Sequence, residues 1–325
     1  MIDMFKKIFK IFEKREAEMT EYPSIIRFSG GGEFDYNFVM SLDEKEYPKY
    51  LSLAYTRKFL KNLNLRHPKT LNEKIQWLKI YDNLPIKTKL TDKVLVRDWV
   101  EEKIGAEHLK PVLWVGKSFD SIPFENLPNS FVIKANHGCS WNIFVKDKVR
   151  FLQNASLVEC AQEQVNGWMS QSYFGWSNFE TQYKNIEPQI LIEEYLSENS
   201  QTPIKEFEVW VFNSKPLFFE QKYLNKETHQ RITSVYDSNY KKIDLKFLPD
   251  SVVDLNSEPA PTLEKAVEYS KVLGNGFKLV RIDWIECNNK LYFNEMTFTP
   301  QSGYFLFKDK YKQWGIKLGS MLKLK

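Results

Sequence analysis

The chain has 325 residues, of which 42% are hydrophobic and 27% charged, and its formal net charge is +4. This length allows one large domain or two smaller ones, and the composition is that of a globular protein rather than a disordered or membrane-spanning chain. The small positive excess fits a polyanionic substrate or an anionic membrane surface, but it is too small to indicate nucleic-acid binding.

Residues 1–16 are predicted to form a basic amphipathic helix, because apolar side chains recur at i, i+3, i+4 and i+7 from Phe5. Such a helix can lie on an anionic membrane, but docking on its own domain or on a second subunit is the preferred interpretation. The Ser-Gly-Gly-Gly run at 29–32 is a flexible break. It is not a phosphate loop, because no strand precedes it and no GK[ST] follows it.

Helices are expected over residues 43–65 and 71–83, so that residues 1–90 form a helical N-terminal region. Thr91 is expected to cap a third helix, which Gly105 ends. Lys93 in its first turn has the wrong sign for the helix dipole. It is either a solvated lysine or part of an anion site at the helix start.

Residues 131–135 and 143–145 are predicted to be antiparallel strands joined by a loop that contains glycine and serine. The backbone N–H groups of such a loop can cover phosphates. Lys134 ends an otherwise apolar strand, and a charge there needs a partner. His137 in the loop is either a base or a residue that caps the turn.

The remaining pattern predicts a helix over 156–172, further strands, and a helix over 262–273 with Thr262 as its cap and Gly274 at its end. The expected strands lie near residues 189–196, 205–212, 217–222 and 232–236. We expect two α+β lobes, over residues 91–192 and 193–325, with a hinge near 193–206.

A predicted β-hairpin over residues 279–304 contains the residues that are best suited to bind a metal ion or a phosphate. With Asn288-Asn289-Lys290 as a three-residue loop, Ile285 faces Phe293, Asp283 faces Glu295 and Arg281 faces Thr297; a two-residue loop puts Asp283 opposite Asn294. Two adjacent carboxylates repel each other and favour a shared cation, and oxygen ligands suit Mg²⁺. The alternative is an ordinary hairpin with a salt bridge, and these residues alone do not separate the two interpretations.

The order of these features resembles the ATP-grasp fold: a lysine at a helix start, a lysine before a flap, an acidic hinge, and a carboxylate pair near the C-terminus. In detail, the strings LNEKIQWLKIYD, FVIKANHG, EEYL and FNEMTFTPQSG resemble the TupA-like ATP-grasp family, named for teichuronopeptide synthesis. The resemblance covers roughly residues 65–320. It implies an α+β fold in which two α+β lobes grip the nucleotide, with an extra helical N-terminal segment.

The resemblance further implies a nucleotide site of ten residues. Two lysines hold the α- and β-phosphates, four flap residues cover the triphosphate, and one acid with two backbone groups reads the adenine. One further acid binds the ribose hydroxyls. In chain order these residues are Lys93, Lys134, His137, Gly138, Ser140, Trp141, Glu193, Tyr195, Leu196 and Glu206.

It also implies a site for two Mg²⁺ ions, with Asp283 and Glu295 as ligands and Glu295 bridging the ions. Arg281 is expected near the transferred phosphate and the tetrahedral intermediate. A third phosphate-binding cation is less clearly marked; Lys222 is the first candidate and Arg231 the second.

The sequence departs from the family pattern at two positions. The third metal ligand, usually an asparagine two residues after the glutamate, is here Thr297, so the second ion is held more weakly or through water. Relatives tend to have glycine where Gln301 stands, which leaves the loop conformation open. Ser302 in this loop completes the candidate catalytic residues.

The expected activity is that of an ATP-dependent carboxylate–amine ligase, which phosphorylates a carboxylate and transfers the acyl group to an amine. The resemblance suggests an amino acid joined to a uronic-acid-bearing surface polysaccharide or its precursor. Four basic residues are candidates to meet that acidic glycan, although a solvated basic face is the more common explanation. They are Lys184, Arg231, Lys241 and Lys242.

The three cysteines are isolated, which excludes a zinc or disulfide framework and favours a reducing compartment. No membrane span or signal peptide is predicted, so a cytoplasmic location is expected, with the helix over 1–16 a candidate contact with the inner face of the membrane. The alternative functions are a glycosyltransferase of capsule synthesis and a non-catalytic nucleotide-binding scaffold. The sequence has no DxD motif for the first, and intact Arg281, Asp283 and Glu295 argue against the second.

Overall fold

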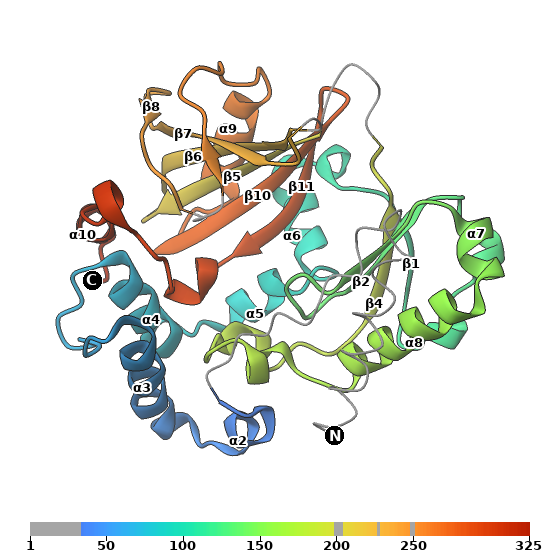
Figure 1. Cartoon of the computed structure of the whole chain (residues 1–325), viewed down its shortest axis with the longest axis horizontal. Helices are drawn as coiled ribbons and strands as arrows, with labels where there is room; N and C mark the ends of the chain where they lie inside the picture. The colour runs from blue at the N-terminus through green and yellow to red at the C-terminus, as the bar shows by residue number, and fades with distance from the viewer. Residues whose placement is uncertain (1–33, 198–203, 226–227, 248–250) are drawn as a thin grey trace.

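A computed structural model describes residues 34–197, 204–225, 228–247 and 251–325 (Figure 1). The helix predicted over 1–16, the glycine run at 29–32 and part of the predicted hinge lie outside these residues. The helices are α2 (Tyr36–Ser41), α3 (Tyr47–Phe59), α4 (Leu71–Tyr81), α5 (Pro85–Thr91), α6 (Val96–Ile104), α7 (Lys148–Gln153), α8 (Ala155–Met169), α9 (Leu263–Leu273) and α10 (Trp314–Met321). The strands are β1 (Val112–Gly116), β2 (Phe131–Ala135), β3 (Asn142–Val145), β4 (Ile190–Glu194), β5 (Lys205–Phe212), β6 (Lys215–Leu224), β7 (Arg231–Asp237), β8 (Lys242–Ile243), β9 (Val252–Val253), β10 (Leu279–Cys287) and β11 (Lys290–Thr297).

The smaller of two sheets has four antiparallel strands in the order β1-β4-β2-β3. Its inner side chains, such as Ile133 and Ile192, are fully buried and pack against Val165 and Trp168 of α8. This burial of apolar side chains holds α7 and α8 on one side of the sheet (Figure 1). The predicted strand–loop–strand unit around the flap is confirmed as β2 and β3.

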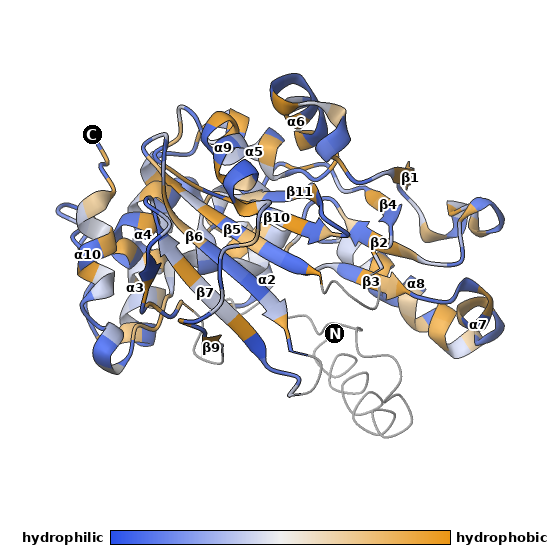
Figure 2. Ribbon diagram, turned by 90° about the horizontal axis from the view of Figure 1, so that it is seen from above, coloured by the Kyte–Doolittle hydropathy of each residue, from blue (hydrophilic) through white to orange (hydrophobic). Residues whose placement is uncertain are grey.

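The larger sheet has seven strands, in the order β11-β10-β5-β6-β7-β8 with β9 parallel to β7. The alternation in β5 gives this sheet two apolar faces. Phe207 and Val209 pack against α6 and α9, whereas Trp210 and Phe212 pack against α4 and α10. Seen from above, the two sheets lie side by side (Figure 2). The predicted α+β class is therefore confirmed.

The helices α2 and α3 pack against the segment that precedes β4. Tyr47 and Leu51 of α3 are buried with Phe174, Phe179 and Tyr183. The helices α5 and α6 instead contribute Leu90, Val96 and Val100 to the core of the larger sheet. The boundaries of the three predicted domains stay a prediction.

The helix α4 holds the loop that follows β11 through a buried polar stripe at i, i+4 and i+7. Asn72 donates to the carbonyl of Phe305 (2.9 Å) and accepts from its N–H (3.1 Å). Gln76 donates to the carbonyl of Ser302 (2.9 Å), and Lys79 donates to the same carbonyl (2.9 Å). Two of the strings that carried the family resemblance, one in α4 and one after β11, are thus physically joined.

The loop after β11 is left-handed at Gln301 (φ 48°) and Ser302 (φ 50°). Glycine adopts this conformation at least cost, and glycine was the residue expected at this position. Gln301 itself adopts the left-handed conformation here.

The predicted loop of the hairpin was wrong, but the pairing of its carboxylates is confirmed. The turn has two residues, Asn288 and Asn289, both with positive φ (53° and 61°), as a type I′ turn requires. A β-bulge between Asp283 and Trp284 in the pairing then shifts the register by one residue. Asp283 therefore lies opposite Glu295, as predicted, whereas Ile285 lies opposite Tyr292 and not Phe293.

One predicted helix cap was also wrong, and a second lacks its capping hydrogen bond. Thr91 is the last residue of α5, and the turn before α6 is capped by the Asp92 side chain, which accepts from the N–H of Val94 (2.8 Å). Thr262 is the N-cap residue of α9, as predicted, but its hydroxyl donates to Glu286 of β10 and makes no capping hydrogen bond. In both cases a tertiary partner or a neighbouring acid replaces the local hydrogen bond.

Candidate active site

Four carboxylates form a row across four adjacent strands of the larger sheet. The strand registers place Glu295 of β11 opposite Asp283 of β10, Asp283 opposite Glu208 of β5, and Glu208 opposite Glu220 of β6. Directly opposed residues point to the same face of a sheet. We call Glu295, Asp283, Glu208 and Glu220 the carboxylate row.

Two cations lie within the carboxylate row. Arg281 binds Asp283 with two hydrogen bonds (Nε–Oδ1 2.7 Å and Nη2–Oδ2 2.6 Å) and lies 3.4 Å from Glu208. Lys222 lies 2.6 Å from Glu208 and 3.3 Å from Glu220. Four carboxylates thus face two cations within the row, and the row keeps an excess of acid even when Lys93, 3.9 Å from Glu295, is counted.

The protonation of the row is uneven. Burial acts to raise the pKa of Glu208, but Arg281 and Lys222 outweigh burial and lower this pKa to about 2. Burial raises the pKa of Glu220 to about 7, although Lys222 acts against the rise. Burial also raises the pKa of Asp283, to which Glu208 adds, whereas Arg281 lowers it. These shifts indicate that a further cation would stabilise the row.

The smaller sheet carries an excess of positive charge. Glu193 of β4 forms ion pairs with Lys134 of β2 (2.7 Å) and with Lys110 (2.9 Å), and Arg97 of α6 lies 4.0 Å away. Burial acts to raise the pKa of Glu193, but Lys110 and Lys134 hold this pKa far below its ordinary value. Burial lowers the pKa of Lys110 to about 8. Three cations thus surround one carboxylate, and we call Arg97, Lys110, Lys134 and Glu193 the cation cluster.

Two lysines connect the cation cluster with the carboxylate row. Lys110 also donates to the side-chain carbonyl of Asn294 (3.0 Å), the extra residue at the β-bulge next to Glu295. Lys93 lies 3.9 Å from Glu295 and donates to the carbonyl of Gly138 in the flap (2.6 Å). The two oppositely charged groups therefore face each other across the edge strand β11, which lies toward the smaller sheet (Figure 1).

The flap residues pack mainly inward. A Cβ on Gly138 would lie 2.3 Å from the ring of Trp141, so the flap needs glycine at this position. Trp141 is buried and stacks on Trp168 (6.2 Å between centroids). His137 is buried, with Nε2 3.0 Å from the carbonyl of Trp168. Ser140 at the tip has a φ of 58° and is exposed.

The other predicted residues are more dispersed. Tyr195 and Leu196 follow β4 directly and are half-buried, and Glu206 is exposed on β5. Thr297 donates to Glu295 (3.3 Å). Arg231 is exposed at the start of β7, outside the carboxylate row. Ser302 lies in the loop after β11, where its Oγ accepts from Lys79 (2.7 Å).

The sequence interpretation missed four members of these groups: Glu208, Glu220, Lys110 and Arg97. The signal for Glu208 was available, because strand alternation puts it on the same face as Glu206. Glu220 and Lys110 had no local signal, since only the pairing of β5 with β6 and the contact with β4 bring them to the site.

Within the described ranges, no cluster of three or more histidine, cysteine, aspartate or glutamate side chains is arranged to hold a metal ion. Asp283 and Glu295 nevertheless form a pair of oxygen donors in a row with excess acid. Such a pair fits an ion that takes its other ligands from water and substrate phosphates, as Mg²⁺ does.

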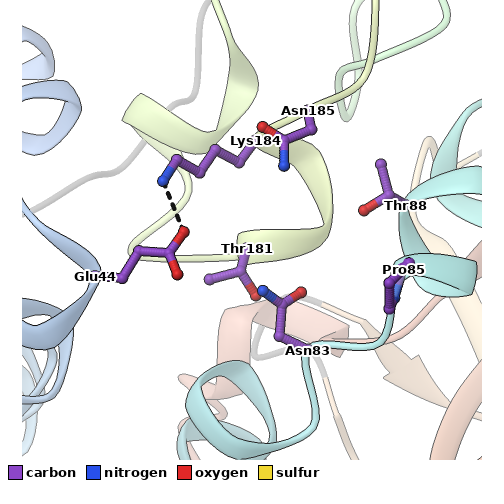
Figure 3. A pocket seen from close by; sticks show the side chains of 7 residues that line it. All are labelled: Glu44, Asn83, Pro85, Thr88, Thr181, Lys184 and Asn185. Carbon is purple, nitrogen blue, oxygen red and sulfur yellow. Dashed lines mark hydrogen bonds and ion pairs between the residues drawn. The ribbon is translucent and has the colours of Figure 1, made fainter.

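A separate pocket of about 250 Å³ lies between α5 and the segment around Thr181 (Figure 3). Figure 3 shows Lys184 on its wall, where the side chain is 2.9 Å from Glu44. The remaining wall consists of Asn83, Pro85, Thr88, Thr181 and Asn185. Among the residues predicted to bind substrate, the glycan candidate Lys184 lines this cavity.

Comparison with known proteins places these features in a family. The sequence model of the family described as TupA-like ATPgrasp matches residues 73–323. No curated protein matches the chain. Within the described residues, no helix combines the length and apolarity that crossing a membrane would need.

The chain is similar to several solved structures with which it shares little sequence identity. The D-alanine–D-alanine ligase from Bacillus anthracis in complex with ATP is 13% identical, with a TM-score of 0.37 over 65% of this chain and 54% of that chain. The ATP-grasp ligase PsnB with minimal precursor, Mg and ADP is 10% identical, with a TM-score of 0.39 over 89% and 75%. The D-alanine–D-alanine ligase from Helicobacter pylori is 14% identical, with a TM-score of 0.39 over 79% and 70%. The chain thus spans little more than half the length of the Bacillus ligase.

Proposed function

Because the chain belongs to the TupA-like ATP-grasp family, we propose that it is an ATP-dependent carboxylate–amine ligase that forms an amide through an acylphosphate. The observation that carries this proposal is the pair of opposed charged groups. The cation cluster holds three cations against one carboxylate, and the carboxylate row holds four carboxylates against Arg281, Lys222 and, at its edge, Lys93. A magnesium–nucleotide complex offers phosphates to the first group and a metal ion to the second.

For the nucleotide, we assign the phosphates to Lys93 and Lys134, beneath the flap from Gly138 to Trp141. Glu193 holds Lys134 and Lys110, so it orients these lysines as well as facing the adenine end. The backbone of Tyr195 and Leu196 then reads the adenine edge. The exposed carboxylate of Glu206, one strand position from Glu208, is assigned to the ribose hydroxyls.

For the metal, we assign Asp283 and Glu295, with Thr297 at most a weak or water-mediated ligand. Mg²⁺ bound there would neutralise charge on the β- and γ-phosphates. Arg281 occupies both oxygens of Asp283 in the structure, so Asp283 would hold an ion only if this bidentate pair opened. The guanidinium of Arg281 would then be available to the reacting phosphate, and Lys222 would stay between Glu208 and Glu220.

The chemistry proceeds in two steps. A substrate carboxylate oxygen attacks the γ-phosphorus, the bond to the β-phosphate oxygen breaks, and ADP leaves an acylphosphate. An amine then attacks the acyl carbon, loses a proton, and expels inorganic phosphate to leave the amide. Arg281 stabilises the oxyanion formed in the second step. The flap excludes water, because the acylphosphate would otherwise hydrolyse.

For the substrates, we propose an amino acid and a uronic-acid-bearing surface polysaccharide or its precursor, as the family name suggests. The positive net charge and the exposed Arg231 and Lys241 support an acidic glycan. Lys184 and Lys242 are less available, since Lys184 pairs with Glu44 and Lys242 donates to the carbonyl of Leu255 (2.9 Å). We further propose a cytoplasmic enzyme that meets the inner face of the membrane through residues 1–16.

The test is thermal stabilisation of the purified chain by Mg·ATP and, separately, by UDP-sugars. Wild type should be stabilised by Mg·ATP, and Lys134→Ala and Glu295→Ala should each lose most of this response. The exposed Lys146→Ala and Glu264→Ala serve as matched controls and should keep it. A response to a UDP-sugar but not to ATP would replace the ligase with the glycosyltransferase.

A further inference from the structure

The pocket between α5 and the segment around Thr181 has room for one small ring (Figure 3). Its volume of about 250 Å³ lies below the range of roughly 300–1,000 Å³ that is usual for pockets holding drug-sized ligands. Both walls are fixed in place. The buried Thr181 donates its hydroxyl to the carbonyl of Lys79 (3.0 Å), and Pro85 is the first residue of α5 on the other side. The pocket is thus a formed site for a ligand much smaller than a nucleotide.

Three polar side chains on the pocket wall have no partner within the protein. Within the described ranges, the side chains of Asn83, Thr88 and Asn185 form no hydrogen bond, and Figure 3 shows all three around the same space. Each amide and the hydroxyl offer both a donor and an acceptor. Carbon atoms, including the ring of Pro85, form most of the remaining surface. The wall therefore matches a ligand that has an apolar face and several hydroxyl groups.

A lysine–glutamate pair completes the wall. Lys184 is 2.9 Å from Glu44, and its ammonium lies over the rings of Tyr47 (5.4 Å) and Phe174 (5.9 Å). These contacts hold the lysine in one place, so a ligand that binds it immobilises little more. The pair has no net charge. Glu44 would repel a ligand carboxylate and Lys184 a ligand ammonium, whereas a hydroxyl group can accept from the lysine and donate to the glutamate.

Both walls of the pocket adjoin the candidate active site. The carbonyl of Thr88 accepts from the N–H of Asp92 (3.2 Å), which directly precedes Lys93, and α5 also contacts β11. On the other wall, Gln182 donates to the hydroxyl of Thr299 (2.7 Å), just after the end of β11. A ligand in the pocket therefore lies beside the segment that carries Lys93 and beside the end of the edge strand.

We propose that this pocket binds one uncharged sugar ring of the glycan substrate. The hydroxyl groups of the ring bond to the two amides, to Thr88 and to the Lys184–Glu44 pair, and its C–H face rests on the carbon of the wall. A ring without charge is not the uronic acid itself, so the reacting unit is a neighbour of this ring. This inference rests on the proposed ligase function and identifies where the glycan lies.

The test titrates the full chain with neutral and charged sugars, with and without Mg·AMP-PNP, and follows binding by saturation-transfer NMR. The neutral probes are the methyl glycosides of glucose, galactose, N-acetylglucosamine and N-acetylgalactosamine, and the charged probes are glucuronic and galacturonic acid. At least one neutral glycoside should bind wild type, and more tightly than either uronic acid does.

Thr88→Val and Asn185→Ala should each weaken the binding of that glycoside about threefold to tenfold, which corresponds to the loss of one hydrogen bond. Both variants should keep the thermal response to Mg·ATP. Asn275→Ala removes an exposed amide beyond the end of α9, outside the pocket. This matched control should bind the glycoside as wild type does.

The proposal is overturned if no neutral glycoside binds wild type, or if both pocket variants bind it as wild type does. A response confined to the uronic acids also overturns it, because the pocket would then take a charged ring. If Thr88→Val does not fold, Asn185→Ala decides, since Asn185 is exposed and its amide has no partner in the protein. Failure of the ligase proposal is recognised separately, since it removes the response of wild type to Mg·ATP.

Discussion

Asp283 of β10 lies directly opposite Glu295 of β11, although the two-residue turn of this hairpin would by itself put Asn294 in that place. The bulge displaces Asn294 from the ladder, and its side chain accepts from Lys110 beside the smaller sheet. One extra residue thus does two things. It keeps both carboxylates on the same face of the sheet, and it joins the edge strand to the cation cluster.

The bulge takes Asn294 out of the ladder. If Asn294 is deleted, Glu295 moves into its place in a regular hairpin, and Asp283 should still lie opposite Glu295. We expect the deletion variant to fold and to keep its thermal response to Mg·ATP, with a loss of about 1 kcal/mol in the free energy of unfolding from the missing hydrogen bond. Chemical denaturation and the thermal-shift assay measure the two quantities.

The matched control is deletion of Tyr292, which also shortens β11 by one residue. That change turns the buried Phe293 away from the core, so it should cost about 3–5 kcal/mol. If the two deletions destabilised the chain equally, the bulge would not be the feature that puts Glu295 on the same face as Asp283.

The raised pKa of Glu220 should make stability depend on pH. With a pKa of about 7 in the folded state and an ordinary value of 4.5, the folded chain binds the proton more tightly than the unfolded chain. This contribution is complete below about pH 4.5 and is lost as the pH rises through about 7, by an amount on the order of 3 kcal/mol.

Glu220→Gln keeps the acceptor for the indole N–H of Trp210 (2.9 Å in wild type) but cannot titrate. Denaturation measured between pH 4.5 and 8 should therefore show a smaller decline for the variant than for wild type. The exposed Glu264→Gln should leave the decline unchanged. Parallel pH profiles for wild type and Glu220→Gln would contradict this assignment.

Gln301→Gly should stabilise the chain, because Gln301 is exposed and has a φ of 48°. Relief of left-handed strain contributes about 1 kcal/mol, less the entropy that glycine adds to the unfolded chain, so we expect a gain of about 0.5 kcal/mol. Glu268→Gly, at an exposed position inside α9, should destabilise by about 1 kcal/mol. Urea denaturation of both variants measures the difference, and a loss of stability in Gln301→Gly would contradict the expectation.

Local pattern was enough to predict the strands β2 and β5 and the helices α4 and α9, because alternation, capping and glycine stops act within a few residues. The pairing of Asp283 with Glu295 was also predicted, but from the wrong loop length. The bulge at Asn294 has no signal in the hairpin itself, since its partner Lys110 is 184 residues away in the chain.

The charges of the site could be predicted only in part for the same reason. Lys134 needed a partner, and that partner proved to be Glu193 of β4, which the family resemblance had assigned to the adenine. Glu220 and Glu208 come together through β5 and β6, and Lys110 reaches Glu193 across β1 and β4 only in the folded chain. Tertiary pairing, rather than sequence spacing, makes each of these contacts.

The last prediction concerns Lys110, which joins the cation cluster to β11. Lys110→Met keeps the length of the stem, leaves Glu193 paired with Lys134, and removes one positive charge and the link to Asn294. We expect the affinity for Mg·ATP to fall about tenfold, in line with the loss of one charge-assisted hydrogen bond. Titration calorimetry measures the affinity. Lys103→Met on α6, outside the cluster, should bind as wild type does. If Lys110→Met binds Mg·ATP as tightly as wild type, the excess positive charge of the cluster does not serve the nucleotide, and Lys110 is a structural tie between β4 and β11 alone.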